Sequence, residues 1–494
     1  FLKFSKQAIM KDALKEILFV RLSPNMCISH PHPQDAAYAF DVAQAAAFLN
    51  RELFEVKFVD GVVENLGVDD IVERIITFTP DILALTTTSS AEQYAMIIFK
   101  RAKELLPDLY IIAFGQHAHY CPDTFLNQSF QIDACVYGEP EETLVELIKN
   151  VPGTPDKKKL TKGIHFWNNR LVKTAERELT IDIDRWPMPR YEIFKNHDYR
   201  IISANFPVFR NIKAGWVLAS RGCPYQCTIC SPAIRRSFGT SLRKSSPQRV
   251  ADTFEFLEHE LKVNTIYIGD DTFSLDMEWA EQVCDELIRR KNKVQWLMST
   301  RVDRLSLMLI EKMKASGMRS AAIGVEAGSK RVLNDINKKI TLEQIEWAVA
   351  EFEKNGISVN VTAIVGHVDE TMEELNETFL FLKKLNPIFV QLHYLSPYPG
   401  TKVADVFKKK FKNTKYISHY NTEPMNVSKI PDDILFGSIK RYYISYYMSW
   451  RFVKKYISQR MPYTLTNPMK EFKLIKDSLA YFLIKDKTEA TSKS

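Results

Sequence analysis

The chain lacks long apolar runs, whereas a membrane-spanning helix needs about 18 or more consecutive apolar residues. We therefore expect no transmembrane segment. Cysteine is also scarce, with seven residues in 494. That odd number, together with the lack of a signal-like apolar stretch near the first residue, predicts a reducing, cytoplasmic setting. The sequence begins at Phe1 rather than at methionine, so we expect the natural start to be missing or trimmed.

Two nucleotide-related signatures are missing as well. No Gly-x-Gly-x-x-Gly follows the first predicted strand, which disfavours a dinucleotide site. No recognised nucleic-acid-binding motif accompanies the basic residues, so we expect no nucleic acid partner. What is present is 45% hydrophobic content in 494 residues, enough for two or three domains with cores of their own.

The most informative residues form a CxxxCxxC loop made of Cys223, Cys227 and Cys230. A four-iron cluster normally takes four cysteine ligands, so three thiolates leave one iron with an open position. The usual occupant of that position is S-adenosylmethionine, which would make the protein a radical enzyme. The alternative is a zinc site, but zinc needs a fourth ligand. The other four cysteines are scattered through the chain, at positions 27, 121, 135 and 284.

Short apolar runs alternate with helical stretches from the cysteine loop onward. Residues 216–220 indicate a buried strand, and Gly222 and Pro224 keep the residues after it out of a helix. Ser246 is the expected N-cap of the first helix, with Pro247 in its first turn. Five more runs of strand length follow, at 265–269, 295–299, 321–325, 359–365 and 389–395. Six strands with intervening helices predict an open, TIM-like partial (β/α)6 barrel, whose chemistry lies at the carboxyl ends of its strands.

The N-terminal part of the chain predicts a separate α/β domain. Five strand-like runs lie at 17–23, 54–60, 82–88, 110–115 and 134–137, with helical stretches between them. This alternation predicts a doubly wound parallel sheet, which binds ligands beyond the carboxyl ends of its strands. We place the boundaries at 1–150 for this domain, 151–212 for a linker, 213–402 for the barrel and 403–494 for a basic, mainly helical C-terminal region.

Motifs at the predicted strand ends carry a resemblance to a known family. The barrel strands end in Gly-Asp-Asp-Thr-Phe at 269–273, Ser-Thr-Arg at 299–301, Gly-Val-Glu-Ala-Gly-Ser at 324–329, Ile-Val-Gly-His at 364–367 and Ser-Pro-Tyr-Pro-Gly-Thr at 396–401. With the cysteine loop, they resemble the radical S-adenosylmethionine superfamily over about 190 residues. In the first domain, Gly-Gln-His at 115–117 and Gly-Glu-Pro-Glu-Glu-Thr at 138–143 resemble a cobalamin-binding domain. The whole chain is thus similar to the cobalamin-dependent radical S-adenosylmethionine enzymes.

The resemblance implies three cofactors: a 4Fe-4S cluster held by the three cysteines, S-adenosylmethionine and cobalamin. The residues implied in S-adenosylmethionine binding are Tyr225, Gly269, Asp270, Asp271, Ser299, Arg301, Glu326 and Ser329. By their chemistry, Asp270 or Asp271 suits the methionine amine, and Arg301 suits the methionine carboxylate. Glu326 and Ser329 suit the ribose hydroxyls or the amine. The alternative is that these polar residues cap the helices that follow the strands.

The residues implied in cobalamin binding follow the strands of the first domain: Ser23, Thr88, Ser89, Gly115, Gln116, His117, Gly138 and Glu139. The Asp-x-His-x-x-Gly cobalt-ligand motif of other cobalamin proteins is absent from every predicted strand end, so no lower histidine ligand is assured. His117 is the one histidine expected beside the corrin, with a packing role as the alternative. His30 and His32 lie in a His-Pro-His-Pro stretch and could face either cofactor or solvent.

Basic charge is concentrated in the tail. Residues 401–494 contain 19 Lys plus Arg against 8 Asp plus Glu, a net charge of +11 in a chain of +7. Six apolar or aromatic residues recur there at spacings of four and three: Ile439, Tyr443, Tyr446, Trp450, Val453 and Ile457. One account is a helix that packs this stripe on the barrel and leaves a basic face in solvent. The other is a surface helix that touches an anionic membrane or covers a hydrophobic substrate.

These features predict a cytoplasmic enzyme, with the tail as a peripheral membrane contact in the second account. It would cleave S-adenosylmethionine reductively to a 5′-deoxyadenosyl radical, remove hydrogen from an unactivated carbon and transfer a methyl group from methylcobalamin. Anaerobic conditions and a flavodoxin- or ferredoxin-type electron donor are expected. The alternative is cyclisation or rearrangement of a lipid or tetrapyrrole with the same cofactors. A non-catalytic sensor fits poorly, because it would not need the open iron. The sequence assigns neither the substrate nor a catalytic residue.

Overall fold

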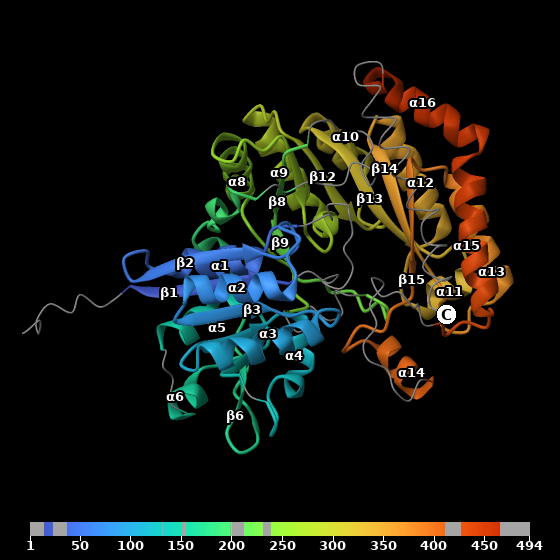
Figure 1. The fold of residues 1–494 in the computed structure, drawn as a ribbon. Coiled ribbons are helices and arrows are strands. Elements are labelled where there is room, and N and C mark those ends of the chain that lie inside the picture. The colour runs from blue at the N-terminus through green and yellow to red at the C-terminus, as the bar shows by residue number, and fades with distance from the viewer. Residues whose placement is uncertain are drawn as a thin grey trace, which may run out of the picture. The chain divides into compact units, whose positions relative to one another are not determined.

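The structure is a computed structural model that describes residues 14–22, 37–130, 132–150, 155–197, 199, 212–230, 239–410 and 426–464. The chain divides into two compact units (Figure 1). The first comprises Phe1–Asp198 with Ser237–Gly239, and the second comprises Tyr199–Arg236 with Thr240–Ser494. This division falls later in the chain than the boundary predicted at residue 150.

Five parallel strands form the main part of the sheet in the first unit. They are β1 (Lys15–Arg21), β2 (Phe54–Asp60), β3 (Ile82–Thr86), β4 (Tyr110–Phe114) and β5 (Ala134–Val136). Their order in the sheet is β2-β1-β3-β4-β5. Because the order reverses between β1 and β3, the carboxyl ends of these strands form the edge at which doubly wound sheets bind ligands.

Helices pack against the sheet of the first unit. They are α1 (Phe40–Phe48), α2 (Val68–Phe78), α3 (Glu92–Leu105), α4 (Gln116–Tyr120) and α5 (Pro140–Lys149). Ile71 of α2 and Ile98 of α3 share one hydrophobic core with Leu18, Leu83 and Ile111 of the strands. Helices α1 and α5 pack against each other and contribute no residue to that core. The predicted doubly wound parallel sheet is confirmed.

The segment predicted as a linker adds two strands to this sheet. β6 (Ile164–Trp167) pairs antiparallel with β5, and β7 (Leu171–Lys173) pairs antiparallel with β6. The connector after them is also fixed to the first unit, because the indole Nε1 of Trp186 donates to Glu142 at 2.9 Å and the ring of Phe194 stacks on Tyr38 at 4.3 Å. The folded part of the first unit therefore extends well past α5.

The second unit contains six parallel strands that lie side by side in chain order. They are β8 (Ala214–Val217), β11 (Thr265–Ile268), β12 (Gln295–Thr300), β13 (Met318–Glu326), β14 (Ser358–Val365) and β15 (Phe389–Tyr394). A separate two-stranded ribbon joins β9 (Ser220–Arg221) to β10 (Arg243–Lys244). Because β8 and β15 do not pair, the sheet is an open barrel, and the predicted partial (β/α)6 fold is confirmed.

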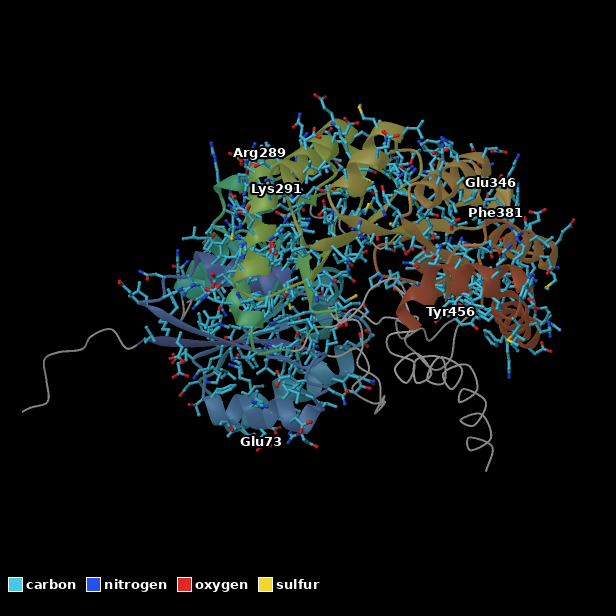
Figure 2. All side chains as sticks on the ribbon, turned by 90° about the horizontal axis from the view of Figure 1, so that it is seen from above. Glu73, Arg289, Lys291, Glu346, Phe381 and Tyr456 are labelled. Atoms are coloured by element: carbon cyan, nitrogen blue, oxygen red, sulfur yellow. The ribbon has the colours of Figure 1, made fainter. Side chains whose placement is uncertain are left out.

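The barrel helices lie on one side of this sheet (Figure 1). They are α8 (Pro247–His259), α9 (Met277–Arg289), α10 (Leu307–Ala315), α11 (Lys330–Asp335), α12 (Leu342–Lys354) and α13 (Met372–Leu385). Ser246 caps α8 by accepting the N–H of Arg249 at 3.3 Å, as its sequence predicts. Glu346 on α12 and Phe381 on α13 lie near each other on adjacent helices (Figure 2), and Lys384 of α13 forms an ion pair with Glu346 at 2.5 Å.

In the described residues that follow the barrel, the helices are α14 (Lys402–Lys410), α15 (Asp432–Tyr447) and α16 (Trp450–Thr464). Helix α15 lies along the unpaired edge of β15. The hydroxyl of Tyr443 accepts the N–H of Leu392 at 2.8 Å, and the hydroxyl of Tyr447 both accepts from and donates to the backbone of Val390, at 3.1 and 3.2 Å. Tyrosine side chains thus satisfy backbone groups that an edge strand would otherwise leave unpaired.

The apolar stripe predicted over 439–457 is wrong as one continuous face. Tyr442 stacks on Phe379 of α13 at 4.5 Å, and Tyr446 is buried and donates to the carbonyl of Pro387 at 2.5 Å. Trp450, by contrast, is 75% exposed. The reason is that α15 ends at Tyr447 and a second helix, α16, begins at Trp450, so the residues of the predicted stripe do not lie on one helix. Packing on the barrel is confirmed for α15, and none of the helices in the described part of the chain has the length and apolar content to span a bilayer.

Changing Tyr443 and Tyr447 to phenylalanine should destabilise the second unit. Each loss of a hydroxyl leaves backbone groups of β15 without a partner, so we expect about 1 kcal/mol per substitution in the free energy of unfolding. Urea denaturation followed by circular dichroism measures this. Ile444→Ala, at an exposed position of the same helix, is the control. If the double variant unfolds at the same urea concentration as the control, the hydroxyls contribute nothing to stability.

Candidate functional site

The cysteine loop leaves the barrel sheet at the carboxyl end of β8, as predicted. After β9, Gly222 takes a backbone angle φ of +93°, which side-chain-bearing residues rarely adopt. This turn directs the chain into the loop. The thiol-bearing residue Cys227 is buried there, and Cys223 and Cys230 are half-buried.

Asp270, which follows β11, anchors the start of the loop. It is 3% exposed, and its two carboxylate oxygens accept the N–H of Ala219 and the hydroxyl of Ser220, each at 2.7 Å. Burial raises the pKa of Asp270 to about 7. Burial, and to a lesser degree the charge of nearby Asp271, raise the pKa of the Cys223 thiol. Asp271 is therefore better placed than Asp270 for the predicted contact with the methionine amine, which stays a prediction.

Arg301, which follows β12, holds the middle of the loop. Its guanidinium lies 3.6 Å from the centroid of the Tyr225 ring, and Nη1 donates to Sγ of Cys227 at 3.9 Å. Nε and Nη2 donate to the two oxygens of Asp303 at 2.9 and 3.2 Å, and Nη2 also donates to the carbonyl of Lys338 at 2.7 Å. The predicted contact between Arg301 and the methionine carboxylate would have to compete with these bonds.

The segment after α11 holds the rest of the loop through two hydrogen bonds. The N–H of Thr228 donates to the carbonyl of Ile336 at 3.0 Å, and the amide of Asn337 donates to the carbonyl of Gln226 at 3.1 Å. Three separate parts of the barrel therefore fix the loop: the ends of β11 and β12 and the α11–α12 connection.

Glu326 ends β13 in a conformation that a side-chain-bearing residue rarely adopts, with φ of +63° next to a shift in strand register. Its carboxylate forms a half-buried ion pair with Nζ of Lys338 at 2.7 Å. Burial raises the pKa of the Cys230 thiol to about 12, and the charge of Lys338 opposes that rise. A cation and a carboxylate thus lie together near the third cysteine, an arrangement that suits the zwitterionic end of methionine. Sequence reasoning missed Lys338, because it lies in a helix connection rather than at a strand end.

The other residues predicted for S-adenosylmethionine lie on the same barrel. The N–H of Gly269 donates to the carbonyl of Val217 at 2.8 Å, which extends the pairing of β11 and β8. Ser299 shares a hydrogen bond of 2.5 Å with the hydroxyl of Tyr267. Ser329 is buried at the start of α11 but makes no side-chain capping bond, so the helix-capping alternative does not hold for it.

The donor atoms of the loop bear on the two metal alternatives. The loop supplies three thiols and no fourth cysteine, and zinc in structural sites takes four ligands. Three thiols, with a guanidinium on one sulfur, are a donor set that fits a cluster with one open iron.

A second candidate site lies at the carboxyl ends of β3, β4 and β5 in the first unit. Gly115, which follows β4, has φ of +95°, and a Cβ there would lie 2.8 Å from the carbonyl oxygen of Thr87. The N–H of Ala118 donates to the hydroxyl of Thr87 at 3.0 Å. These contacts join the loop after β3 to the start of α4.

Gly138, which follows β5, is the open point of this second site. Its φ is +76°, and a Cβ there would meet no atom within 4 Å. Its N–H donates to Nδ1 of His119 at 2.9 Å, which fixes the turn. A strand end with free space above a glycine fits the edge of a large planar ligand. Sequence reasoning missed His119, although it lies two residues after His117.

His117 is fully buried, and protein groups surround both of its ring nitrogens. Nδ1 lies 3.1 Å from the hydroxyl of Ser89, and Nε2 lies 3.0 Å from the hydroxyl of Thr124 and 3.1 Å from the carboxylate of Glu92. Burial lowers the pKa of His117 to about 4, so the ring is neutral at physiological pH. These contacts agree with the packing role that the sequence left open.

The remaining residues predicted for cobalamin differ in exposure. Thr88 is exposed, and Gln116 and Glu139 are half-buried at the starts of α4 and α5. Ser23, His30 and His32 lie outside the described residues.

Comparison with known proteins identifies both units. Residues 217–382 match the radical SAM superfamily, and residues 37–148 match the B12 binding domain. The chain belongs to the cobalamin-dependent radical S-adenosylmethionine enzymes. It is 29% identical, over 81% of its length and 86% of the relative's, to an uncharacterized methyltransferase of Pyrococcus horikoshii. It is 28% identical to the anaerobic magnesium-protoporphyrin IX monomethyl ester cyclase of Rubrivivax gelatinosus, over 74% of this chain and 65% of that protein.

A solved structure of this family shares the fold. The radical S-adenosylmethionine methyltransferase TsrM of Kitasatospora setae, with cobalamin and a [4Fe-4S] cluster bound, superposes with a TM-score of 0.63 at 20% identity, over 80% of this chain and 75% of that one. The family's cofactors, a 4Fe-4S cluster, S-adenosylmethionine and cobalamin, are those predicted from the sequence. The cysteine loop suits the cluster and the opening above Gly138 suits cobalamin.

Replacing Gly138 should weaken cobalamin binding in this family member, whereas replacing His117 should not change the cobalt's ligands. Valine at 138 fills the open space and strains a left-handed backbone, so we expect at least a tenfold loss of affinity. His117→Ala should lower the free energy of unfolding by about 2 kcal/mol through its lost hydrogen bonds. Absorbance titration measures the affinity for cobalamin, and paramagnetic resonance of the cob(II)alamin form shows the ligands of the cobalt. Urea denaturation measures the free energy of unfolding.

Gly67→Ala is the control for Gly138→Val, because a Cβ there makes only ordinary contact with Asp70. Strong nitrogen coupling to cobalt that disappears in His117→Ala would overturn the packing role and make His117 a ligand.

Proposed function

We propose that this enzyme methylates an unactivated carbon of a small-molecule substrate. When bound, the cluster and S-adenosylmethionine supply a 5′-deoxyadenosyl radical that abstracts hydrogen, and methylcobalamin supplies the methyl group. The observation that supports this most strongly is the three-cysteine loop, held by strand-end side chains, in the same chain as a cobalamin-type sheet. The Pyrococcus relative, named a methyltransferase, supports methylation over other outcomes.

The chain's own residues would bind and orient S-adenosylmethionine at the cysteine loop. Asp271 near Cys223 suits the methionine amine, and the Glu326–Lys338 pair near Cys230 suits its charged end. Asp270 acts indirectly, because its carboxylate is used by the backbone that enters the loop. We assign these roles from the charge of each residue and from its proximity to one of the three thiols.

Cyclisation without methylation is the second candidate function. It rests on the similarity to the magnesium-protoporphyrin cyclase, which is nearly as high as that to the methyltransferase. Both outcomes begin with the same hydrogen abstraction, so the residues around the cluster do not distinguish them. The product's mass does.

Reconstituted protein, prepared anaerobically, should contain about four irons at the cysteine loop and should release 5′-deoxyadenosine. Cys227→Ala should abolish that release, because the loop then offers too few thiolates. Cys284→Ala, a buried cysteine on α9 outside the loop, should behave like the wild type. Mass spectrometry of extracts from cells with and without the protein should show a product heavier by one CH2. A product that has only lost hydrogens would favour cyclisation, and stoichiometric zinc without iron would end the proposal.

The cluster needs an electron from outside the chain, and we propose a flavodoxin- or ferredoxin-type protein as the donor. We also propose that the outward face of α15 and α16 contacts anionic membrane. Residues 434–464 contain six basic residues and no acidic one. Exposed apolar side chains lie among those charges, with Met448 at 74% and Trp450 at 75% exposure. Attraction to an anionic surface is worth about 1 kcal/mol per basic residue, so a few contacts would give reversible binding.

Point variants test the membrane contact better than removal of the tail, because removal would uncover the edge of β15. Changing both Met448 and Trp450 to alanine, or both Arg451 and Lys454 to glutamine, should reduce sedimentation with anionic vesicles by at least threefold. Iron and cobalamin contents should stay unchanged. Ser458→Ala, on the exposed face of α16, is the control. Equal sedimentation of all variants, or equal binding to zwitterionic vesicles, would contradict the proposal.

A further inference from the structure

Arg301 is a charged side chain that donates directly to a cysteine of the loop, and its surroundings give it a role beyond holding the loop. We infer that the Arg301–Asp303 pair sets the reduction potential of the cluster, with Arg301 raising it and Asp303 limiting that rise. This inference rests on the proposed assignment of the cluster to the loop. It gives Arg301 a role different from the contact with the methionine carboxylate that its sequence motif suggests.

The contacts of Arg301 leave little freedom in where its charge lies. One face of the guanidinium stacks on Tyr225 at 3.6 Å, and its N–H groups make four hydrogen bonds, two to Asp303, one to the Lys338 carbonyl and one to Sγ of Cys227. Tyr225 is itself fixed, because its hydroxyl donates to Asp303 at 3.2 Å and accepts from Arg304 at 2.7 Å. The N–H that points at the sulfur is therefore preorganised.

Burial makes this arrangement electrostatically effective. The side chain of Arg301 is 6% exposed and that of Asp303 is 16% exposed. Charges removed from solvent are screened weakly by water and salt, so they act strongly on a neighbouring group. Hydrogen bonds to the sulfurs and the net charge nearby are among the factors that set the potential of an iron–sulfur cluster. Reduction adds negative charge, so a fixed cation on the Cys227 sulfur favours the reduced state.

Removing the charge of Arg301 and removing the charge of Asp303 should shift the reduction potential in opposite directions. Arg301→Gln removes the cation and should lower the potential. Asp303→Asn removes the negative charge that partly neutralises the guanidinium, and should raise the potential. Arg301→Lys keeps the charge but loses the planar stacking and the paired bonds to Asp303, so its potential should lie between those of the wild type and Arg301→Gln. A role limited to holding the loop would instead loosen the cluster in all three variants.

The experiment is a redox titration of the reconstituted full-length protein, followed by paramagnetic resonance of the reduced cluster, with iron and sulfide content measured for each variant. Arg290→Gln is the control, because Arg290, the C-cap residue of α9, pairs with Glu286 and Asp252. The control should match the wild type, Arg301→Gln should titrate at lower potential, and Asp303→Asn should titrate at higher potential.

Shifts of the same sign in Arg301→Gln and Asp303→Asn, or unchanged potentials with full iron content, would overturn the inference. If Arg301→Gln fails to hold iron, Asp303→Asn decides: a higher potential supports the inference and any other result overturns it. Wild-type protein without iron would mean that the proposed function fails. An iron-loaded protein whose potential does not change when Arg301 or Asp303 is replaced would overturn the inference alone.

Discussion

A carboxylate that follows one strand joins the barrel sheet to the loop that follows another. Asp270 accepts hydrogen bonds from Ala219 and Ser220, and this interaction sets where the cysteine loop begins. A loop with three thiols cannot be fixed by regular backbone pairing, because its own N–H and C=O groups must leave space for a ligand. Side chains from neighbouring strand ends therefore have to hold it, and the open parallel barrel brings those ends to one edge.

The same requirement explains why Arg301 and the α11–α12 connection converge on the loop. Asp270 fixes its start, Arg301 fixes its middle through Tyr225 and Cys227, and Asn337 fixes the backbone between them. Each contact comes from a different element, so the thiol positions depend on the barrel being folded. The cofactor site therefore forms only when the strands of the barrel have assembled in the correct order.

The sequence predicted the strands well because most buried parallel strands are continuous apolar runs, as in β3 and β4, and such runs are visible without any tertiary information. It also placed the polar motifs at the correct edge. The sequence could not tell which of Asp270 and Asp271 holds the loop backbone and which suits the methionine amine. The two residues are chemically identical, and only the fold decides which one is buried. Lys338 was invisible for a related reason: nothing in a helix connection marks a lysine that will pair with Glu326. The tail stripe failed because one helix period was extended across the end of α15 at Tyr447.

The hydroxyl caps on β15 have a consequence for synthesis of the chain. Val390 and Leu392 are bonded by tyrosines more than 50 positions later in the sequence. On the ribosome the sixth strand therefore emerges before the helix that covers it. During that interval the barrel presents a bare strand edge, the kind of surface on which partly made chains associate with one another. The synthesis of α15 thus also ends the period in which this strand edge is exposed to other chains.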